Sequence, residues 1–343
     1  MRPASYTDEY EVAAAIEDCR PHVVLLGAGA SYAAFPNGDK NGRKLPLLRD
    51  FVGVIGLEDL MSEAGVSPPY DDFEAMYSDI AADSKRAHVR SRIDSAVLSY
   101  FQSLELPDEP TLYDHLVLSL RPKDVIATFN WDPFLWQACQ RNRSFGGAPC
   151  LLFLHGSVSI GRCNHCQNVS ARGALCPTCG NALDDVPILF PVTQKDYNSD
   201  AAIAEHWRTL KRTLKAAYAL TIFGYSAPKT DVEAVELMKE GWGTSDERNM
   251  EEIEIIDIRD EESLRSSWDE FIHTHHYTIK PSFYDSCIAR HPRRSCEALW
   301  ARLMENTFIC PFPIPRAAQF DGLYNWLRPQ IEAEDHSKHG KSP

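Results

Sequence analysis

The chain has 343 residues, of which 44% are hydrophobic and 24% are charged. This length suits two average domains or one large α/β domain with an insert, and the composition excludes a disordered, collagen-like or low-complexity protein. The formal net charge of −14 makes nucleic acid and an anionic membrane poor candidates for the main partner, because both repel an acidic surface.

The N-terminal segment MRPASYTDEYEVAAAIEDCR has acidic residues where a signal peptide needs a basic end and an apolar stretch. No apolar run approaches the roughly 18 residues that a membrane span requires. We therefore expect a cytoplasmic protein without membrane contact. In that compartment the ten cysteines are better interpreted as metal ligands or buried thiols than as disulfides.

Short apolar segments alternate with helical patterns along the chain, which is typical of a parallel β-sheet covered by helices. The predicted strands are His22–Leu26, Asp124–Phe129, Cys150–Leu154, Tyr218–Phe223 and Glu252–Ile258. Each is rich in Val, Ile, Leu or Phe, as expected for strands buried on both faces. Apolar residues at helical spacing predict helices around Val89, Ile93 and Val97, and along Ile203, Trp207, Leu210, Leu214 and Ala217.

Polar or small residues follow each predicted strand. They are Gly27–Ser31 (GAGAS), Asn130-Trp131-Asp132, His155-Gly156-Ser157, Gly224-Tyr225-Ser226 and Asp257. Ligands of open parallel sheets bind outside the carboxyl ends of the strands, so these segments predict one shared site. The GAGAS segment would present backbone N–H groups to a phosphate, although a purely structural turn gives the same pattern. Tyr32 stands where the dehydrogenase fingerprint requires glycine, which excludes that class.

Two C-x-x-C pairs lie between the third and fourth predicted strands, at Cys163, Cys166, Cys176 and Cys179. Each pair can place two thiolates on one tetrahedral ion, so the spacing predicts a zinc ribbon; two disulfides and a redox pair are the alternatives. Four thiolates leave no open coordination position, and this zinc would be structural.

The order GAGAS, N-x-D, HGS, four-cysteine ribbon and GYS resembles the sirtuin family over about residues 22–260, roughly two thirds of the chain. The resemblance implies a Rossmann-like NAD-binding core with a zinc-ribbon module. Matched position by position, it implies NAD binding by Gly27, Ala28, Gly29, Ser31, Asn130, Asp132, Gly224, Ser226 and Asp257. It also implies catalysis by His155 as the base, together with Asn130 and Asp132.

Departures from the family pattern fall on its nicotinamide and acyl-lysine sides. Phe129 replaces the glutamine before N-x-D, Leu47 stands where an aspartate is expected, and Phe190-Pro191-Val192-Thr193 replaces the segment that clamps an acyl-lysine strand. The aromatic Trp131 within N-x-D and the GYS-A-P turn look more like bacterial sirtuin-like proteins of antiviral defence, which consume NAD.

This resemblance favours an NAD glycohydrolase that acts in antiviral defence. An NAD-dependent protein-lysine deacylase and a non-catalytic NAD or ADP-ribose sensor are the alternatives. We expect NAD as the small-molecule partner, and a regulatory protein partner or self-assembly as the macromolecular one. We expect residues 1–158 and 185–330 to form the Rossmann-like domain and residues 159–184 the ribbon insert. Residues 331–343 are polar and without periodicity, which predicts a flexible tail.

Overall fold

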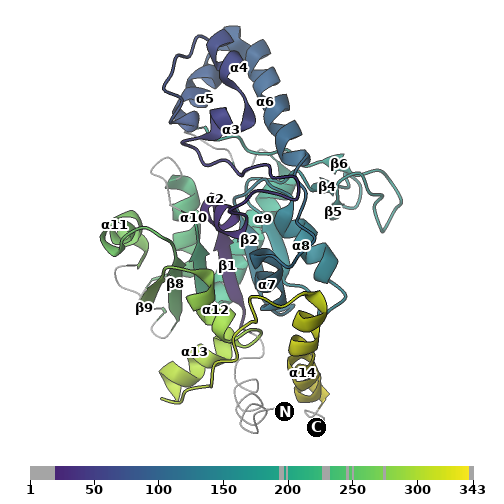
Figure 1. Ribbon diagram of the computed structural model, residues 1–343, viewed down its shortest axis with the longest axis vertical. Coiled ribbons are helices and arrows are strands. Elements are labelled where there is room, and N and C mark those ends of the chain that lie inside the picture. The colour runs from purple at the N-terminus through teal and green to yellow at the C-terminus, as the bar shows by residue number, and fades with distance from the viewer. Residues whose placement is uncertain are drawn as a thin grey trace.

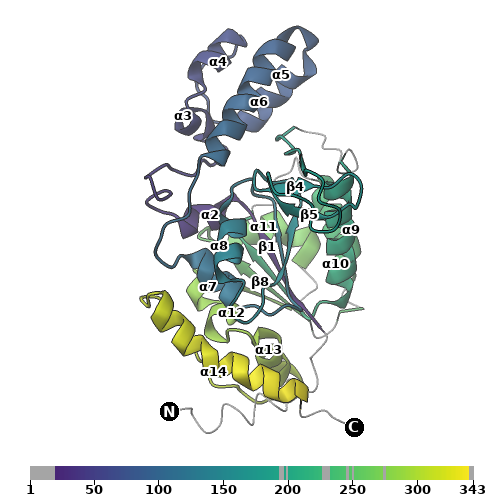
Figure 2. The ribbon, with the colours of Figure 1, turned by 90° about the vertical axis from the view of Figure 1, so that its right-hand side faces the viewer.

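The computed structural model describes residues 20–192, 197, 200–225, 232–244, 247–248, 251–272 and 276–339. A central parallel sheet is flanked by helices on both faces, and a group of helices stands beyond one edge of this body (Figures 1 and 2). None of the helices in these residues combines the length and apolar character needed to cross a membrane.

The central sheet has six parallel strands in the order β3-β2-β1-β7-β8-β9. Numbered within the sheet this is 3-2-1-4-5-6, the order of the Rossmann fold. The strands are β1 (His22–Leu26), β2 (Val125–Thr128), β3 (Cys150–Phe153), β7 (Ala219–Phe223), β8 (Glu252–Ile256) and β9 (His276–Lys280). The expected α/β class and the five predicted strands are confirmed.

Strand β9 is an addition to the prediction. It pairs with β8 at the edge of the sheet, and its side chains are only half-buried or exposed. An edge strand with a mixed polar sequence does not give the continuous apolar run by which the other five strands were recognised.

Alternate side chains of the strands enter two cores, one on each face. Val23 and Leu25 of β1 face one core, which includes Trp207 of α9, whereas Val24 and Leu26 face the other. The first core lies under α9 (Ala201–Ala216), α10 (Val232–Trp242) and α11 (Glu261–Ile272). The second lies under α2 (Ala28–Ala34), α7 (Leu112–Leu118), α8 (Phe134–Asn142) and α12 (Cys287–Arg290).

The group of helices beyond the carboxyl ends of the strands is a helical lobe. It consists of α3 (Phe51–Ile55), α4 (Glu58–Glu63), α5 (Phe73–Ala82) and α6 (Ala87–Gln102), and Figure 1 draws it above α2. In α6 the predicted stripe of Val89, Ile93 and Val97 is buried. The core of the lobe is continuous with the core on the α2 face of the sheet.

The cysteine-bearing segment forms a small antiparallel sheet of β4 (Ile160–Arg162), β5 (Val169–Ala171) and β6 (Asp184–Asp185). The exact division into residues 1–158 with 185–330 and residues 159–184 stays a prediction.

Helices α13 (Ser295–Met304) and α14 (Phe320–His339) lie at the opposite end of the molecule from the lobe (Figure 2). Helix α14 extends through Ile331–His339, so the expected flexible tail is wrong for these residues. Glu334 of α14 is buried and forms an ion pair with buried Arg293, 2.5 Å between its Oε1 and the arginine Nε. One of the polar residues of this segment, Glu334, is therefore buried in an ion pair. Residues 340–343 lie outside the described residues.

Candidate functional site

A cavity of about 780 Å³ lies between the carboxyl ends of the strands and the helical lobe. This volume is within the range of small-molecule and cofactor sites. The segments after β1, β2, β3, β7 and β8 all contribute to its wall, and so do Phe51 and Phe101 of the lobe. Of the predicted site residues, it is lined by Gly27, Ala28, Gly29, Ser31, Asn130, Asp132, His155, Gly224 and Asp257. Ser226 lies outside the described residues.

Two glycine turns meet at the base of the cavity. The N–H groups of Gly27 and Gly29 donate to the carbonyl oxygens of Phe223 (3.0 Å) and Gly224 (2.9 Å). A Cβ atom on Gly27 would lie 2.5 Å from the Gly224 oxygen, so the two turns approach as closely as glycine allows. The GAGAS segment therefore has a structural function, which is to join the ends of β1 and β7; phosphate binding there stays a prediction.

The Asn130-Trp131-Asp132 segment is tied to this turn by hydrogen bonds. Asn130 Nδ2 donates to the Gly27 carbonyl oxygen and to Ser31 Oγ, each at 2.9 Å. Ser31 Oγ donates to Asp132 Oδ2 at 2.7 Å, and the Phe134 N–H donates to Asp132 Oδ1 at 3.2 Å. Burial raises the pKa of the Asp132 carboxyl to about 6, against the lowering effect of these hydrogen bonds.

His155 follows β3 and lies among aromatic rings. Its Nε2 is 3.2 Å from the hydroxyl of Tyr197, and its ring meets the edge of Phe129 with 5.0 Å between the centroids. Phe129, which replaces the family's glutamine, stacks in turn on Tyr225 at 4.1 Å. Gly156 has φ +75°, and a Cβ atom there would lie 2.0 Å from the Pro187 oxygen. The turn that carries His155 thus requires glycine.

Asp257 lines the cavity beyond β8, and its carboxylate is engaged by Arg259. The Arg259 backbone N–H donates to Asp257 Oδ1 at 2.9 Å, and its guanidinium pairs with Oδ2, also at 2.9 Å. Arg259 lines the cavity too and adds a cation that the sequence analysis did not single out. The segment Leu45–Arg49, which departs from the family pattern, forms part of the same wall.

Tyr113 is the principal polar residue near the site that the sequence did not reveal. It belongs to α7, is 1% exposed, and places its hydroxyl 2.6 Å from Ser31 Oγ. A single tyrosine in the largely apolar helix LYDHLVL, beside Asp114 and His115, gives no spacing signal and is typical of a core residue.

The four predicted zinc ligands come together in the small sheet. The sulfur atoms of Cys163, Cys166, Cys176 and Cys179 all lie within 4.8 Å of one another. In a tetrahedral zinc site sulfur atoms are about 2.3 Å from the metal and hence about 3.8 Å apart, so the four thiols fit a zinc ion. None of the four is in a disulfide. The cluster therefore fits a structural metal that would stabilise an insert with a very small core, made of Cys163, Cys176 and Leu183.

No family model and no curated protein matches this sequence. Among solved structures, the fold is similar to a complex of a Sir2 homologue with NAD, at 14% identity over 86% of this chain and 94% of that chain, with a TM-score of 0.38. A Sir2 complex with an inhibitor, 2′-O-acetyl-ADP-ribose and a deacetylated p53 peptide has 14% identity, coverages of 84% and 94%, and a TM-score of 0.37.

A third structure, from work on the structural basis of sirtuin substrate affinity, has 16% identity and a TM-score of 0.38. The match covers 79% of this chain and 100% of that chain. At such identities and TM-scores this similarity defines neither the family nor the activity. The functional assignment therefore has to come from the residues of the cavity.

Proposed function

We propose that this protein is an NAD glycohydrolase, which converts NAD and water to ADP-ribose and nicotinamide. The observation that carries the proposal is the convergence of Asn130, Asp132 and His155 with two glycine turns on one cavity. This cavity lies at the carboxyl ends of a sheet with Rossmann strand order, which is where such sheets bind nucleotides. The sirtuin-like order of the motifs indicates NAD as that nucleotide.

The reaction breaks the bond between C1′ of the ribose and the nicotinamide nitrogen, and the bonding pair leaves with nicotinamide. The ribose carbon becomes positively charged, and the oxygen of a water molecule attacks it. His155 accepts the proton that this water loses, since a neutral imidazole is a suitable base near neutral pH. Asn130 orients the water, and the negative charge of buried Asp132 stabilises the developing positive charge.

Hydrolysis is favoured over deacylation by the aromatic wall beside Asp132. Trp131 packs against Phe51, Phe101 and Phe190, with centroid distances of 6.2, 5.6 and 5.5 Å. Phe190 belongs to the segment that replaces the family's acyl-lysine clamp, and its ring stacks on Tyr77 at 5.0 Å. Because this half-buried ring packs against Tyr77 and Trp131, we expect the segment to offer little support for a bound peptide. A function in antiviral defence follows from the motif resemblance and is part of the same proposal.

Protein-lysine deacylation is the second candidate, because the four-cysteine ribbon of the deacylases is retained. A product analysis with and without an acetylated peptide separates the candidates. The glycohydrolase releases nicotinamide and ADP-ribose from NAD alone. A deacylase releases nicotinamide only with the peptide and forms acyl-ADP-ribose, and a sensor binds NAD without turnover. Nicotinamide release that depends on the peptide would overturn the proposal.

A further inference from the structure

A buried cluster of polar groups forms part of the cavity wall. Ser31, Tyr113 and Asp132 are 2%, 1% and 4% exposed. Ser31, Asp132 and half-buried Asn130 line the cavity, whereas Tyr113 lies behind them. The Ser31 hydroxyl is the centre of the cluster, because it contacts Asp132 Oδ2 at 2.7 Å, Tyr113 OH at 2.6 Å and Asn130 Nδ2 at 2.9 Å.

The number of protons available fixes the direction of each hydrogen bond. An ionised Asp132 can only accept, so Ser31 donates its single proton to Asp132. The Ser31 oxygen must then accept from its other two neighbours, which makes the Tyr113 hydroxyl a donor. The second amide proton of Asn130 goes to the carbonyl oxygen of Gly27, which can also only accept.

Both amide protons of Asn130 are thus engaged inside the protein. The amide nitrogen must face Gly27 and Ser31, so the amide oxygen Oδ1 must point the other way. Asn130 lines the cavity, and its Oδ1 has no hydrogen-bond partner among the described residues. The cluster therefore leaves Asn130 with a single acceptor for a group bound in the cavity.

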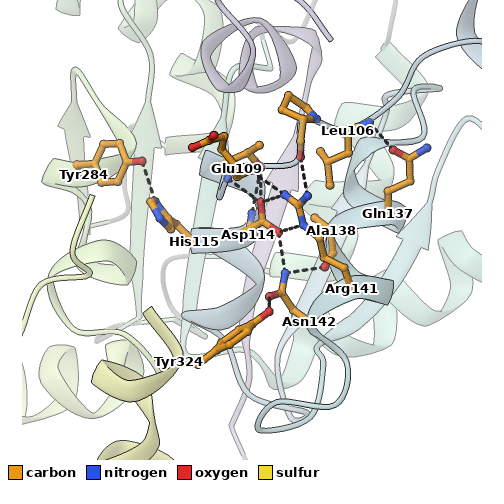
Figure 3. A network of polar contacts seen from close by, with 12 residues as sticks. Leu106, Glu109, Asp114, His115, Gln137, Ala138, Arg141, Asn142, Tyr284 and Tyr324 are labelled. Atoms are coloured by element: carbon orange, nitrogen blue, oxygen red, sulfur yellow. Dashed lines mark hydrogen bonds and ion pairs between the residues drawn. The ribbon is translucent and has the colours of Figure 1, made fainter. Parts of the chain in front are cut away.

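Tyr113 is held firmly by the helix that carries it. Figure 3 shows the residue that follows it, Asp114, bound to Arg141 and Asn142 of α8; the arginine Nε and the asparagine Nδ2 both lie 2.7 Å from its Oδ1. Asp114 also accepts from the backbone N–H of Thr111 and so caps the start of α7. The Tyr113 ring packs edge-on against Phe35 at 5.5 Å. The phenol oxygen is therefore placed before any ligand binds.

We propose that Tyr113 is a positioning residue, whose hydroxyl donates to Ser31 and thereby holds the Asn130 amide with its oxygen toward the reacting water. The expected effect on turnover rests on the proposed function. The hydrogen-bond pattern does not, because it is present in the protein without NAD. Tyr113 does not line the cavity and acts only through Ser31 and Asn130.

The kinetic test is Tyr113→Phe, which removes the proton donor and keeps the ring. We expect kcat to fall roughly 10- to 100-fold, as for a small misplacement of a catalytic group, while KM for NAD changes less than about twofold. Tyr77→Phe is the matched control, because Tyr77 is another fully buried tyrosine whose hydroxyl donates a hydrogen bond. Its acceptor is Asp94 Oδ1 at 2.6 Å, and both residues belong to the helical lobe. This control should keep its kcat.

A double-mutant cycle separates the positioning of Asn130 from a non-specific loss of order in the site. In the Asn130→Ala background Tyr113→Phe should cause no further loss of kcat, because the residue that it positions is absent. Losses that simply multiply in the double variant, or a Tyr113→Phe variant with unchanged kcat, would overturn the inference.

A measurement on the protein without NAD keeps this inference distinct from the proposed function. The side-chain amide protons of Asn130 should exchange slowly with solvent in the wild type and at least roughly tenfold faster in Tyr113→Phe, as followed by NMR. Equal exchange rates would contradict the positioning role even if NAD cleavage is observed. Absence of NAD cleavage in the wild type, with faster exchange in the variant, would instead contradict only the proposed function.

Discussion

Gly224 closes the turn after β7, and its replacement by alanine tests how the base of the cavity is built. Its φ is +62°, and a Cβ atom would lie 2.1 Å from the Ala30 nitrogen and 2.4 Å from the Gly29 carbonyl carbon. Left-handed backbone costs about 1–2 kcal/mol for a residue with a side chain. Overpacking against atoms that cannot rotate away adds about 1–3 kcal/mol, and loss of the hydrogen bond to Gly29 about 1 kcal/mol. We therefore expect Gly224→Ala to lower the free energy of unfolding by about 4 kcal/mol.

Gly65→Ala is the matched control, because Gly65 has φ +78° with nothing within 4 Å of its added Cβ atom. This variant should lose only the conformational part, about 1 kcal/mol. Urea unfolding measures both free energies, and calorimetric titration with ADP-ribose measures binding, which only Gly224→Ala should weaken. Equal losses of stability in the two variants would show that the contact between the two glycine turns is not what requires Gly224.

Two further predictions concern the metal and a buried acid. Cys176→Ser should release about one zinc ion per chain and lower the Tm by roughly 5 °C or more, whereas the control Cys310→Ser should keep the metal. Metal analysis and thermal unfolding measure these two effects. A wild-type protein that contains no zinc would refute the prediction. Burial raises the pKa of Asp132 to about 6 in the folded protein, which means that folding favours the protonated carboxyl. The stability gained from this protonated form is fully present below pH 4 and is lost as the pH rises through 6. The free energy of unfolding of Asp132→Asn relative to the wild type should therefore increase by about 3 kcal/mol from pH 4 to pH 7, and a pH-independent difference in urea unfolding would contradict it.

The sequence was most informative where strands are buried on both faces. Val23 and Val24 of β1 enter opposite cores, and this double burial produces the uninterrupted apolar runs from which five strands were predicted. Because the strands are parallel, the polar residues after them had to meet at one edge of the sheet. The convergence of Asn130, His155 and Asp257 on the cavity follows from that rule.

Features that depend on contacts between distant segments could not be predicted in this way. Helix α14 continues through the polar segment Ile331–His339, where Glu334 pairs with Arg293, a partner 41 residues away that no local pattern reports. The sequence revealed α6 of the helical lobe but not the three shorter helices that pack with it. Tyr113 of α7 joins the cluster only because the fold brings its hydroxyl to Ser31 of α2, and no spacing along the chain reports that contact.

The most direct test of the central claim is the effect of His155→Ala on turnover and on binding. His155 is 8% exposed and lines the cavity. In the proposed reaction it takes the proton of the attacking water, whereas the glycine turns and Asp257 would hold the parts of NAD that do not react. His88→Ala, an exposed histidine of α6, is the control and should keep wild-type turnover. For His155→Ala we predict a kcat for NAD cleavage that is roughly 10²- to 10⁴-fold lower, with a Kd for ADP-ribose within about twofold of the wild-type value. Near-normal cleavage by this variant would contradict the assignment of His155 as the base and make Asn130 the main catalytic residue.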